Sequence, residues 1–468
     1  MPAAARLAGA GSLMPMPASG PPLKTERGSR PIAGVVSTLL SRAAPRGGLL
    51  RSSAILFFGG SLARAVGFLF SVAAARLLLP ADYGLLAYGL AIVGFASILV
   101  TSAPSGLAAF LSRYQGNRRQ QELHFSNWLV VISILIAVSA ILMVPIAVIA
   151  RLSGPMLIGI IANLLGIAVL QTYREAQRGL ERFAAMVIFY LLANVIQLFA
   201  VLVLAAFGFR SAAVFLTVYG LSSLAALAVV QPLAPLALGF VRETVELEHI
   251  IAVARFIQPL VLQTVFFAVW IGADLILVQR LMPPDAAGNY AAAKALANAV
   301  YLAPSAVSGV VITRVSRMPE ISLRGFLLRV MALGVGVTMP LLLIFVFFGG
   351  PLTSVIFGSR YPQAAEPLAV LSAGMAVYGV YLLLSGAWRG MGRLAIDAWA
   401  TGAGTLATVG LGLLLVTRVG LIGAAIAFTA GSVVQLLTIS GYTVRALAIG
   451  AGSRLDVVMA QGGSAHDG

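Results

Sequence analysis

The sequence predicts an all-α polytopic membrane protein with about twelve transmembrane helices, arranged as two six-helix lobes that are related by a parallel repeat around a central cavity. Composition is the first reason. Of 468 residues, 60% are apolar and 10% are charged, against about 45–50% and about 25% in soluble domains. The apolar runs are also long and continuous, unlike the alternating strands of a β-barrel. Finally, motifs of the first half return in the second.

Twelve hydrophobic segments follow one another along the chain, each with the roughly 20 residues that a helix needs to cross a bilayer. In chain order they are 54–78, 84–110, 126–150, 155–173, 184–207, 212–232, 256–280, 287–312, 324–348, 363–387, 394–416 and 420–444. Six of them fall in an expected N-lobe at 51–232, and six in an expected C-lobe at 256–445.

The remaining segments differ in composition. Residues 1–50 are rich in Pro, Gly, Ala and Ser with scattered Arg, and they hold no run long enough to span a membrane. We expect a disordered cytoplasmic tail there, and a second cytoplasmic tail at 446–468. Residues 233–255 form the longest internal connection. Apolar residues spaced by four beside three glutamates predict an amphipathic helix on the cytoplasmic membrane surface there, as a linker between the lobes.

The basic residues predict the topology. With both termini in the cytoplasm, 22 of the 31 Lys and Arg residues fall in cytoplasmic segments, 6 in external loops and 3 within spans. Cytoplasmic loops of membrane proteins carry such an excess. The net charge of +16 therefore indicates an even number of spans with both ends inside, and we expect no nucleic-acid partner.

Four short motifs recur in the same order in the two halves, at offsets of 200 to 212 residues. The pairs are Pro80 and Gly84 with Pro284 and Gly288, Ala103-Pro104-Ser105 with Ala303-Pro304-Ser305, Arg178-Gly179 with Arg389-Gly390, and Ala212-Ala213-Val214 with Ala424-Ala425-Ile426. Because the offset covers six spans, the two halves keep the same orientation in the membrane. Two such lobes leave a cleft between them, which suits alternating access.

Three stretches resemble a known family: ARLLLPADYGLLAY at 75–88, VIFGSRYPQAAEPLAVLS at 355–372 and GLIGAAIAFTAGS at 420–432. The first is similar to that family's a-R-x-L-G-P-x-x-Y-G turn after span 1, although Leu79 stands where the pattern has Gly. The second is similar to its F-G-x-x-Y-x-x-A-x-x-x-L turn before span 10. Over about 50–445 the chain therefore resembles the multidrug/oligosaccharidyl-lipid/polysaccharide (MOP) flippase superfamily. Within it, the chain resembles the Wzx-type polysaccharide and lipopolysaccharide biosynthesis flippases.

This resemblance implies a transporter of the bacterial inner (plasma) membrane. It would move undecaprenyl-diphosphate-linked oligosaccharide repeat units from the cytoplasmic to the periplasmic leaflet by alternating access, for exopolysaccharide or O-antigen biosynthesis. Its partners would be the lipid-linked oligosaccharide, membrane lipid, and polysaccharide polymerase or export proteins. The alternatives are a cation-coupled multidrug (MATE-type) antiporter and, from another class, a membrane glycosyltransferase, ligase or polymerase.

The residue inventory gives no sign of catalysis. There is no cysteine, the three His residues are far apart in the sequence, and no Walker A motif is present. The external loops, about five to fifteen residues each, are short for a glycan-transferring enzyme. We therefore expect no enzyme activity, no metal and no cofactor. Ion gradients, membrane potential and pull by downstream polymerisation stay open as energy sources.

Four ionisable residues stand out within the predicted spans: Arg64 in span 1, Asp274 in span 7, Lys294 in span 8 and Arg329 in span 9. Such groups are costly in a bilayer and face a cavity or a partner. In the superfamily, spans 1, 2, 7 and 8 line the central cavity. The resemblance therefore implies that Arg64 and Lys294 bind the substrate diphosphate, with Asp274 as their charge partner or as an ion-coupling group.

Each of these residues also has a plainer interpretation. Arg64 can be held by packing between the lobes. Lys294 can extend to the external interface. Asp274 can pair with Lys294 or Arg280, and Arg329 is best explained as an interfacial residue.

Polar side chains within the spans are candidate glycan contacts. They are Asn194 and Gln197 in span 5, Asn298 and Tyr301 in span 8, and Gln171 and Tyr173 in span 4. The alternative is that they hydrogen-bond to neighbouring helices, as Asn and Gln commonly do in membranes.

Overall fold

The structure, a computed structural model, describes residues 49–462 except 237, 316–322 and 392. In this part of the chain every regular element is a helix. A chain in hydrocarbon has to satisfy its backbone N–H and C=O groups internally, and a helix does so within one segment. The predicted tail at 1–50 lies outside the described residues, apart from Leu49 and Leu50, which begin the first helix.

The predicted all-α membrane fold is confirmed. The helices are α2 (Leu49–Leu77), α3 (Pro80–Ala96), α4 (Ile98–Ser102), η1 (Ala103–Gly106), α5 (Leu107–Arg113), α6 (Arg118–Ile149), α7 (Gly154–Gly179), α8 (Phe183–Ala206), α9 (Ala212–Val230), η2 (Arg242–Thr244), α10 (Leu247–Leu281), α11 (Pro284–Val315), α12 (Leu323–Phe357), η4 (Pro362–Ala364), α13 (Ala365–Gly390), α14 (Leu394–Val419) and α15 (Leu421–Gly462). Within the described residues, ten are long and apolar enough to cross a membrane. The helix α11 and the broken unit α3–α5 coincide with the other two predicted segments.

The second predicted segment, 84–110, is not one helix. It consists of α3, α4, the 3-10 turn η1 and α5. The break coincides with side chains that compete for backbone carbonyls: Thr101 Oγ1 donates to Ser97 O at 2.9 Å, and Ser102 Oγ donates to Ile98 O at 2.7 Å. Such bonds bend helices, and Pro104 removes a further backbone donor.

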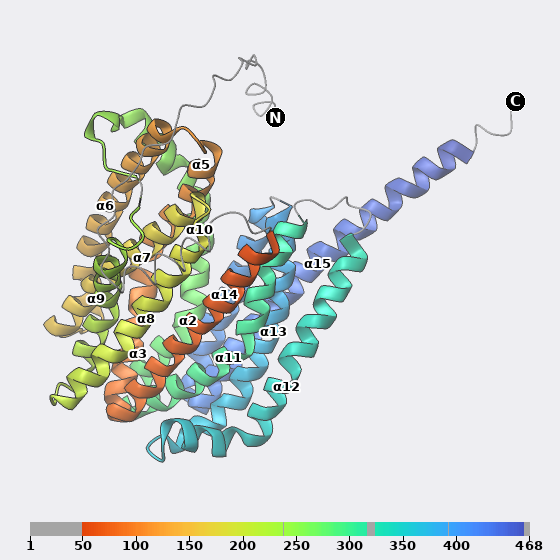
Figure 1. Cartoon of the computed structure of the whole chain (residues 1–468). Helices are drawn as coiled ribbons and strands as arrows, with labels where there is room; N and C mark the ends of the chain where they lie inside the picture. The colour runs from red at the N-terminus through yellow and green to blue at the C-terminus, as the bar shows by residue number, and fades with distance from the viewer. Residues whose placement is uncertain (1–48, 237, 316–322, 392, 463–468) are drawn as a thin grey trace, which may run out of the picture.

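The connection between the halves lies against α6. Val241 N donates to Ser126 Oγ at 2.9 Å, and Glu246 N donates to Asn127 Oδ1 at 3.0 Å. Within 233–255, the 3-10 helix η2 is followed by Leu247, where α10 begins and continues without interruption into the seventh span. At the other end of the C-lobe, α15 continues past 445 to Gly462 and projects from the bundle (Figure 1).

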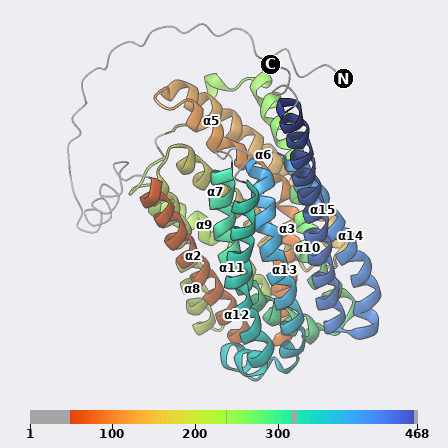
Figure 2. The same ribbon diagram turned by 90° about the vertical axis from the view of Figure 1, so that its right-hand side faces the viewer.

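The helices form two lobes, α2–α9 and α10–α15, which stand side by side in Figure 1. Between them lie α2, α3, α10 and α11: α3 packs on α10 and α11, and α2 touches α11. Figure 2 shows α11 between α2 and α13. We call the end with the turns 78–79, 282–283 and 358–361 the turn face (the lower end in Figure 1), and the opposite end, where α2 begins and α15 leaves, the terminal face.

Repeat-related glycines make equivalent contacts in the two lobes. A Cβ atom on Gly179 of α7 would lie 2.7 Å from Leu111 Cβ, and one on Gly390 of α13 would lie 2.7 Å from Ile312 O. The fourth span is therefore packed closely against the second, and the tenth against the eighth. These matching contacts support the parallel repeat.

The two lobes meet at the turn face through backbone. A Cβ atom on Gly84 of α3 would lie 2.6 Å from Gly288 N of α11, and one on Gly288 would lie 2.0 Å from Pro80 O. Small residues allow membrane helices to approach this closely. Beside this contact, the Tyr361 hydroxyl donates to Ala75 O at 2.7 Å, which adds a hydrogen bond between the lobes.

We expect Gly220→Ala to destabilise the N-lobe. A Cβ atom there would lie 2.4 Å from Ala162 C in the backbone of α7, which can yield only by moving the helix. Overpacking of this kind costs about 1–3 kcal/mol, so the melting temperature in detergent should fall. Gly410→Ala is the matched control, because its Cβ would enter open space. Equal melting temperatures for the two variants would contradict the packing described here.

Candidate functional site

Two arginines lie on helices of the N-lobe, and one of them contacts the C-lobe. Arg64 of α2 is half-buried and its Nη1 donates to Ser305 Oγ of α11 at 3.3 Å. Arg174 of α7 has its guanidinium carbon 4.7 Å from the centre of the Tyr190 ring in α8, a cation–π contact. Its Nε is buried without a hydrogen-bond partner. Within the described chain, neither guanidinium forms an ion pair with a carboxylate.

Ser305, the partner of Arg64, lies one helical turn from Tyr301 on α11. Glu175, the residue that follows Arg174, has its carboxylate 3.0 Å from the guanidinium of Arg178. We call Arg64, Arg174, Tyr190 and Tyr301 the arginine cluster. Cations with open donors in a span are suited to an anionic ligand, since guanidinium offers a planar fork to phosphate oxygens.

Some of the predicted glycan contacts form hydrogen bonds within the protein, and others have a buried polar atom without a partner. Asn194 Nδ2 donates to Tyr190 O at 2.7 Å, and its Oδ1 lies against Gly67 of α2, so it joins α2 to α8. Gln197 Nε2 and Asn298 Oδ1 are buried with no hydrogen-bond partner in the described part of the chain. Tyr301 lies in the arginine cluster.

Lys294 and Asp274 form a buried ion pair within the C-lobe. Lys294 Nζ lies 2.6 Å from Asp274 Oδ1 and 2.7 Å from Oδ2, and it also donates to Ile271 O at 2.6 Å. The hydroxyl of Tyr290 donates to Asp274 Oδ2 at 2.7 Å. Asp274 is 1% exposed and Lys294 is 8% exposed. The ammonium donors of Lys294 are therefore already used.

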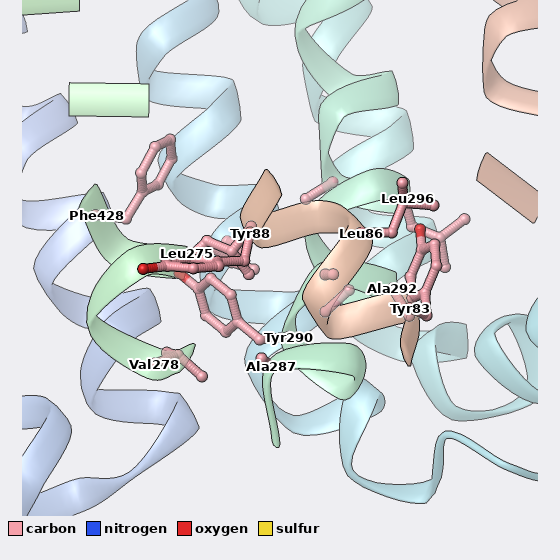
Figure 3. Packing of buried hydrophobic residues seen from close by; sticks show 14 of the residues in the cluster. Tyr83, Leu86, Tyr88, Leu275, Val278, Ala287, Tyr290, Ala292, Leu296 and Phe428 are labelled. Atoms are coloured by element: carbon pink, nitrogen blue, oxygen red, sulfur yellow. The ribbon is translucent and has the colours of Figure 1, made fainter. Parts of the chain in front are cut away.

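Aromatic and aliphatic side chains enclose this pair. Lys294 Nζ lies 5.0 Å from the centre of the Phe428 ring, which stacks on Trp270 at 4.8 Å. Figure 3 shows Tyr290 among Leu275 and Val278 of α10, with Phe428 nearby. Such surroundings exclude water, so the two charges depend on each other.

A second buried carboxylate lies toward the terminal face. Asp397 of α14 is 1% exposed and accepts hydrogen bonds from Tyr381, Ser385 and Arg389 of α13 and from Gln263 of α10. Arg389 Nε lies 2.8 Å from Asp397 Oδ2. This network joins three helices of the C-lobe and leaves the carboxylate saturated.

The charges are divided unequally between repeat-related positions. At the offset of 204, Asp274 corresponds to Phe70 of the N-lobe and Lys294 to Leu90. In the opposite direction, Arg64 corresponds to Ala268. The N-lobe therefore carries Arg64 without a carboxylate partner. The C-lobe carries the paired charges Asp274 and Lys294 at positions where the N-lobe has apolar residues.

The structure thus brings Arg64 and Tyr301 together and places Lys294 with Asp274 elsewhere. Arg329 is exposed on α12, away from both groups. Sequence reasoning missed Arg174, because the apolar run of span 4 ends at 173 while α7 continues to Gly179. It also missed Asp397, although this acid lies three residues inside the predicted span 394–416 and could have been found by its position.

Comparisons with known proteins agree with this architecture. The profile of a family described as "Polysaccharide biosynthesis protein" matches residues 73–366. None of the curated proteins matches the chain.

Solved structures show the same fold. An inward-facing multidrug resistance MATE family transporter of the MOP superfamily is 12% identical, with a TM-score of 0.68, over 89% of this chain and 99% of that one. The lipid II flippase MurJ, inward closed, is 16% identical, with a TM-score of 0.66, over 85% and 87%. A Vibrio cholerae MATE transporter, VcmN, in the bent form is 14% identical, with a TM-score of 0.60, over 88% and 98%. The fold is that of the MOP superfamily.

We expect Lys294→Met to be strongly destabilising, because it leaves Asp274 charged and unpaired in an apolar environment. Breaking one side of a buried pair costs about 3–5 kcal/mol. The double variant Asp274→Asn with Lys294→Met should melt at a higher temperature than Lys294→Met alone. Thermal unfolding in detergent measures both. If the double variant melted at no higher a temperature than Lys294→Met alone, the two side chains would not be coupled as the distances indicate.

Proposed function

The chain belongs to the family described as polysaccharide biosynthesis proteins, and we propose that it is a flippase for lipid-linked oligosaccharide. The substrate is an undecaprenyl-diphosphate-linked repeat unit, moved from the cytoplasmic to the periplasmic leaflet of the bacterial inner membrane. Support comes from the family match and the transporter fold. The observation that carries the substrate class is the arginine cluster, which holds two cations without carboxylate partners in the N-lobe, one of them bonded to α11 of the C-lobe.

The cluster is suited to the diphosphate rather than to the glycan. A diphosphate needs charge-assisted hydrogen bonds in a low-dielectric site. Arg64 and Arg174 supply such donors from two helices, and Tyr301 adds a hydroxyl from the opposite lobe. Lys294 is left out of the diphosphate site, because Asp274 already holds its ammonium group. The pair instead holds α10 and α11 together in the C-lobe.

Transport proceeds by alternating access in this proposal. The lobes are in contact at the turn face, which we assign to the periplasm, with both termini in the cytoplasm as the Lys and Arg distribution predicts. The lipid-linked substrate enters from the terminal face, its diphosphate binds the arginine cluster, and opening of the turn face releases the glycan outward.

A multidrug antiporter is the second candidate, because MATE transporters share the fold. A pump for organic cations needs a free acid in its binding site. Within the described spans, the buried Asp274 and Asp397 are both paired with basic residues. Drug sensitivity of a deletion strain that still makes normal polysaccharide would favour this function.

The test of the flippase is a deletion strain complemented with variants. We expect lipid-linked oligosaccharide to accumulate on deletion and to be cleared by the wild-type protein. Arg64→Ala and Arg174→Ala should each reduce clearance by about tenfold or more, because a hydrogen bond to a charged group contributes about 1.5–3 kcal/mol. Arg64→Lys should retain part of the activity, since it keeps the charge without the fork.

Arg329→Ala is the matched control. It removes an arginine from a span, but that arginine is exposed on α12 outside the arginine cluster. The Arg329→Ala protein should clear lipid-linked oligosaccharide as the wild-type protein does at equal expression. Full clearance of lipid-linked oligosaccharide by both Arg64→Ala and Arg174→Ala would show that the arginine cluster is not part of the transport site. Absence of any accumulation on deletion would overturn the flippase itself.

A further inference from the structure

Two arginines at the turn face bind across the boundary between the lobes. Arg76, at the end of α2, donates through Nε to Ile356 O at 2.8 Å and through Nη2 to Val355 O. Both carbonyls belong to the last turn of α12, in the other lobe. Arg280, at the end of α10, donates through Nη2 to Ile149 O at 2.8 Å, in the last turn of α6. Each arginine therefore reaches the third span of the opposite lobe.

These two interactions are related by the internal repeat. Arg76 and Arg280 are 204 residues apart, the same offset that relates Pro80 to Pro284 and Gly84 to Gly288. Their acceptors, Ile149 and Ile356, are 207 residues apart and end equivalent helices. The interaction thus occurs twice, exchanged between the lobes, on either side of the close approach of Gly84 and Gly288.

The acceptors suit a cation. The last four carbonyls of a helix have no partner within the helix, and the helix dipole makes that end negative. A guanidinium group satisfies the carbonyls and the dipole together. The bond depends on the position of the opposite lobe, since the acceptors move away when the lobes separate at the turn face.

We propose that Arg76 and Arg280 are a paired latch that holds the turn face closed, and that both must release their carbonyls when that face opens. This proposal rests on the alternating access of the proposed function, but not on the identity of the substrate. The latch sets the balance between the state closed at the turn face and the state open there.

The two halves of the latch are not equally strong. Arg76 holds two carbonyls. Arg280 holds one carbonyl and the hydroxyl of Tyr88, with Nε at 3.1 Å from that oxygen. Arg280 also borders a hollow of about 250 Å³ that is lined in part by Tyr88, Arg151 and Ser153. Both guanidinium groups are exposed, so the difference lies in the acceptors, and loss of Arg76 with its two helix-end carbonyls should open the turn face more than loss of Arg280.

The chain contains no cysteine, which makes a single reporter thiol possible. Leu86→Cys places it on α3 at the lobe boundary, where Leu86 is 1% exposed and lies beside Leu296 of α11 (Figure 3). The smaller side chain introduces no clash. A membrane-impermeant maleimide applied from the turn face reacts only when the lobes separate there. Its rate of reaction measures the open population.

On the Leu86→Cys background, we expect Arg76→Ala to raise the labelling rate by about tenfold and Arg280→Ala to raise it by less. The double variant should exceed both. Arg76→Lys, which keeps the charge and can hold one carbonyl, should lie between the wild type and Arg76→Ala.

Arg210→Ala is the matched control. Arg210 also lies at the turn face and donates through Nε to a helix-end carbonyl, Ala205 O at 3.1 Å, but within its own lobe. Its removal should leave the labelling rate unchanged. The latch is overturned if the double variant labels at the wild-type rate, or if Arg210→Ala raises labelling equally. Because the readout is conformational, a protein that carries another substrate would still show the effect.

Discussion

The arrangement of the two lobes depends on one close approach of backbone, at Gly84 and Gly288. A side chain at either position would occupy space that the backbone of the other lobe fills. This contact sets the distance between α3 and α11, and with it the reach of every group that crosses the boundary. Tyr361 reaches Ala75, Arg76 reaches α12 and Arg280 reaches α6 only because the helices come this near. Glycine is required here for space, not for backbone conformation.

The spans could be predicted from sequence because hydrocarbon leaves the chain almost no choice other than helix. The prediction was less complete where helices extend past their apolar run. Arg174 lies beyond the apolar part of span 4, yet it belongs to α7, which continues to Gly179. The break after Ala96 was missed for another reason. It depends on which carbonyls Thr101 and Ser102 bond, and hydropathy does not report that choice.

The site was predictable in its residue types and less so in its pairings. The sequence puts Arg64, Asp274 and Lys294 within spans, and the family resemblance implies that these spans line the lobe boundary. Both leave open whether Asp274 neutralises Lys294 or serves transport. Helix rotation decides this, because it turns Lys294 into the C-lobe toward α10. Rotation is determined by side-chain packing, here by Trp270 and Phe428, and one sequence carries little information on it.

The Asp274–Lys294 pair also bears on how the protein enters the membrane during synthesis. Lys294 lies on α11, and this helix has to cross the bilayer with the lysine inside it. A lone lysine near the middle of a helix costs about 2.5–3.5 kcal/mol to insert. Its counter-charge lies on the preceding helix, joined by the turn at 282–283. A hairpin of α10 and α11 brings both charges into the bilayer as a neutral unit, so the two helices are cheaper to insert together than α11 is alone.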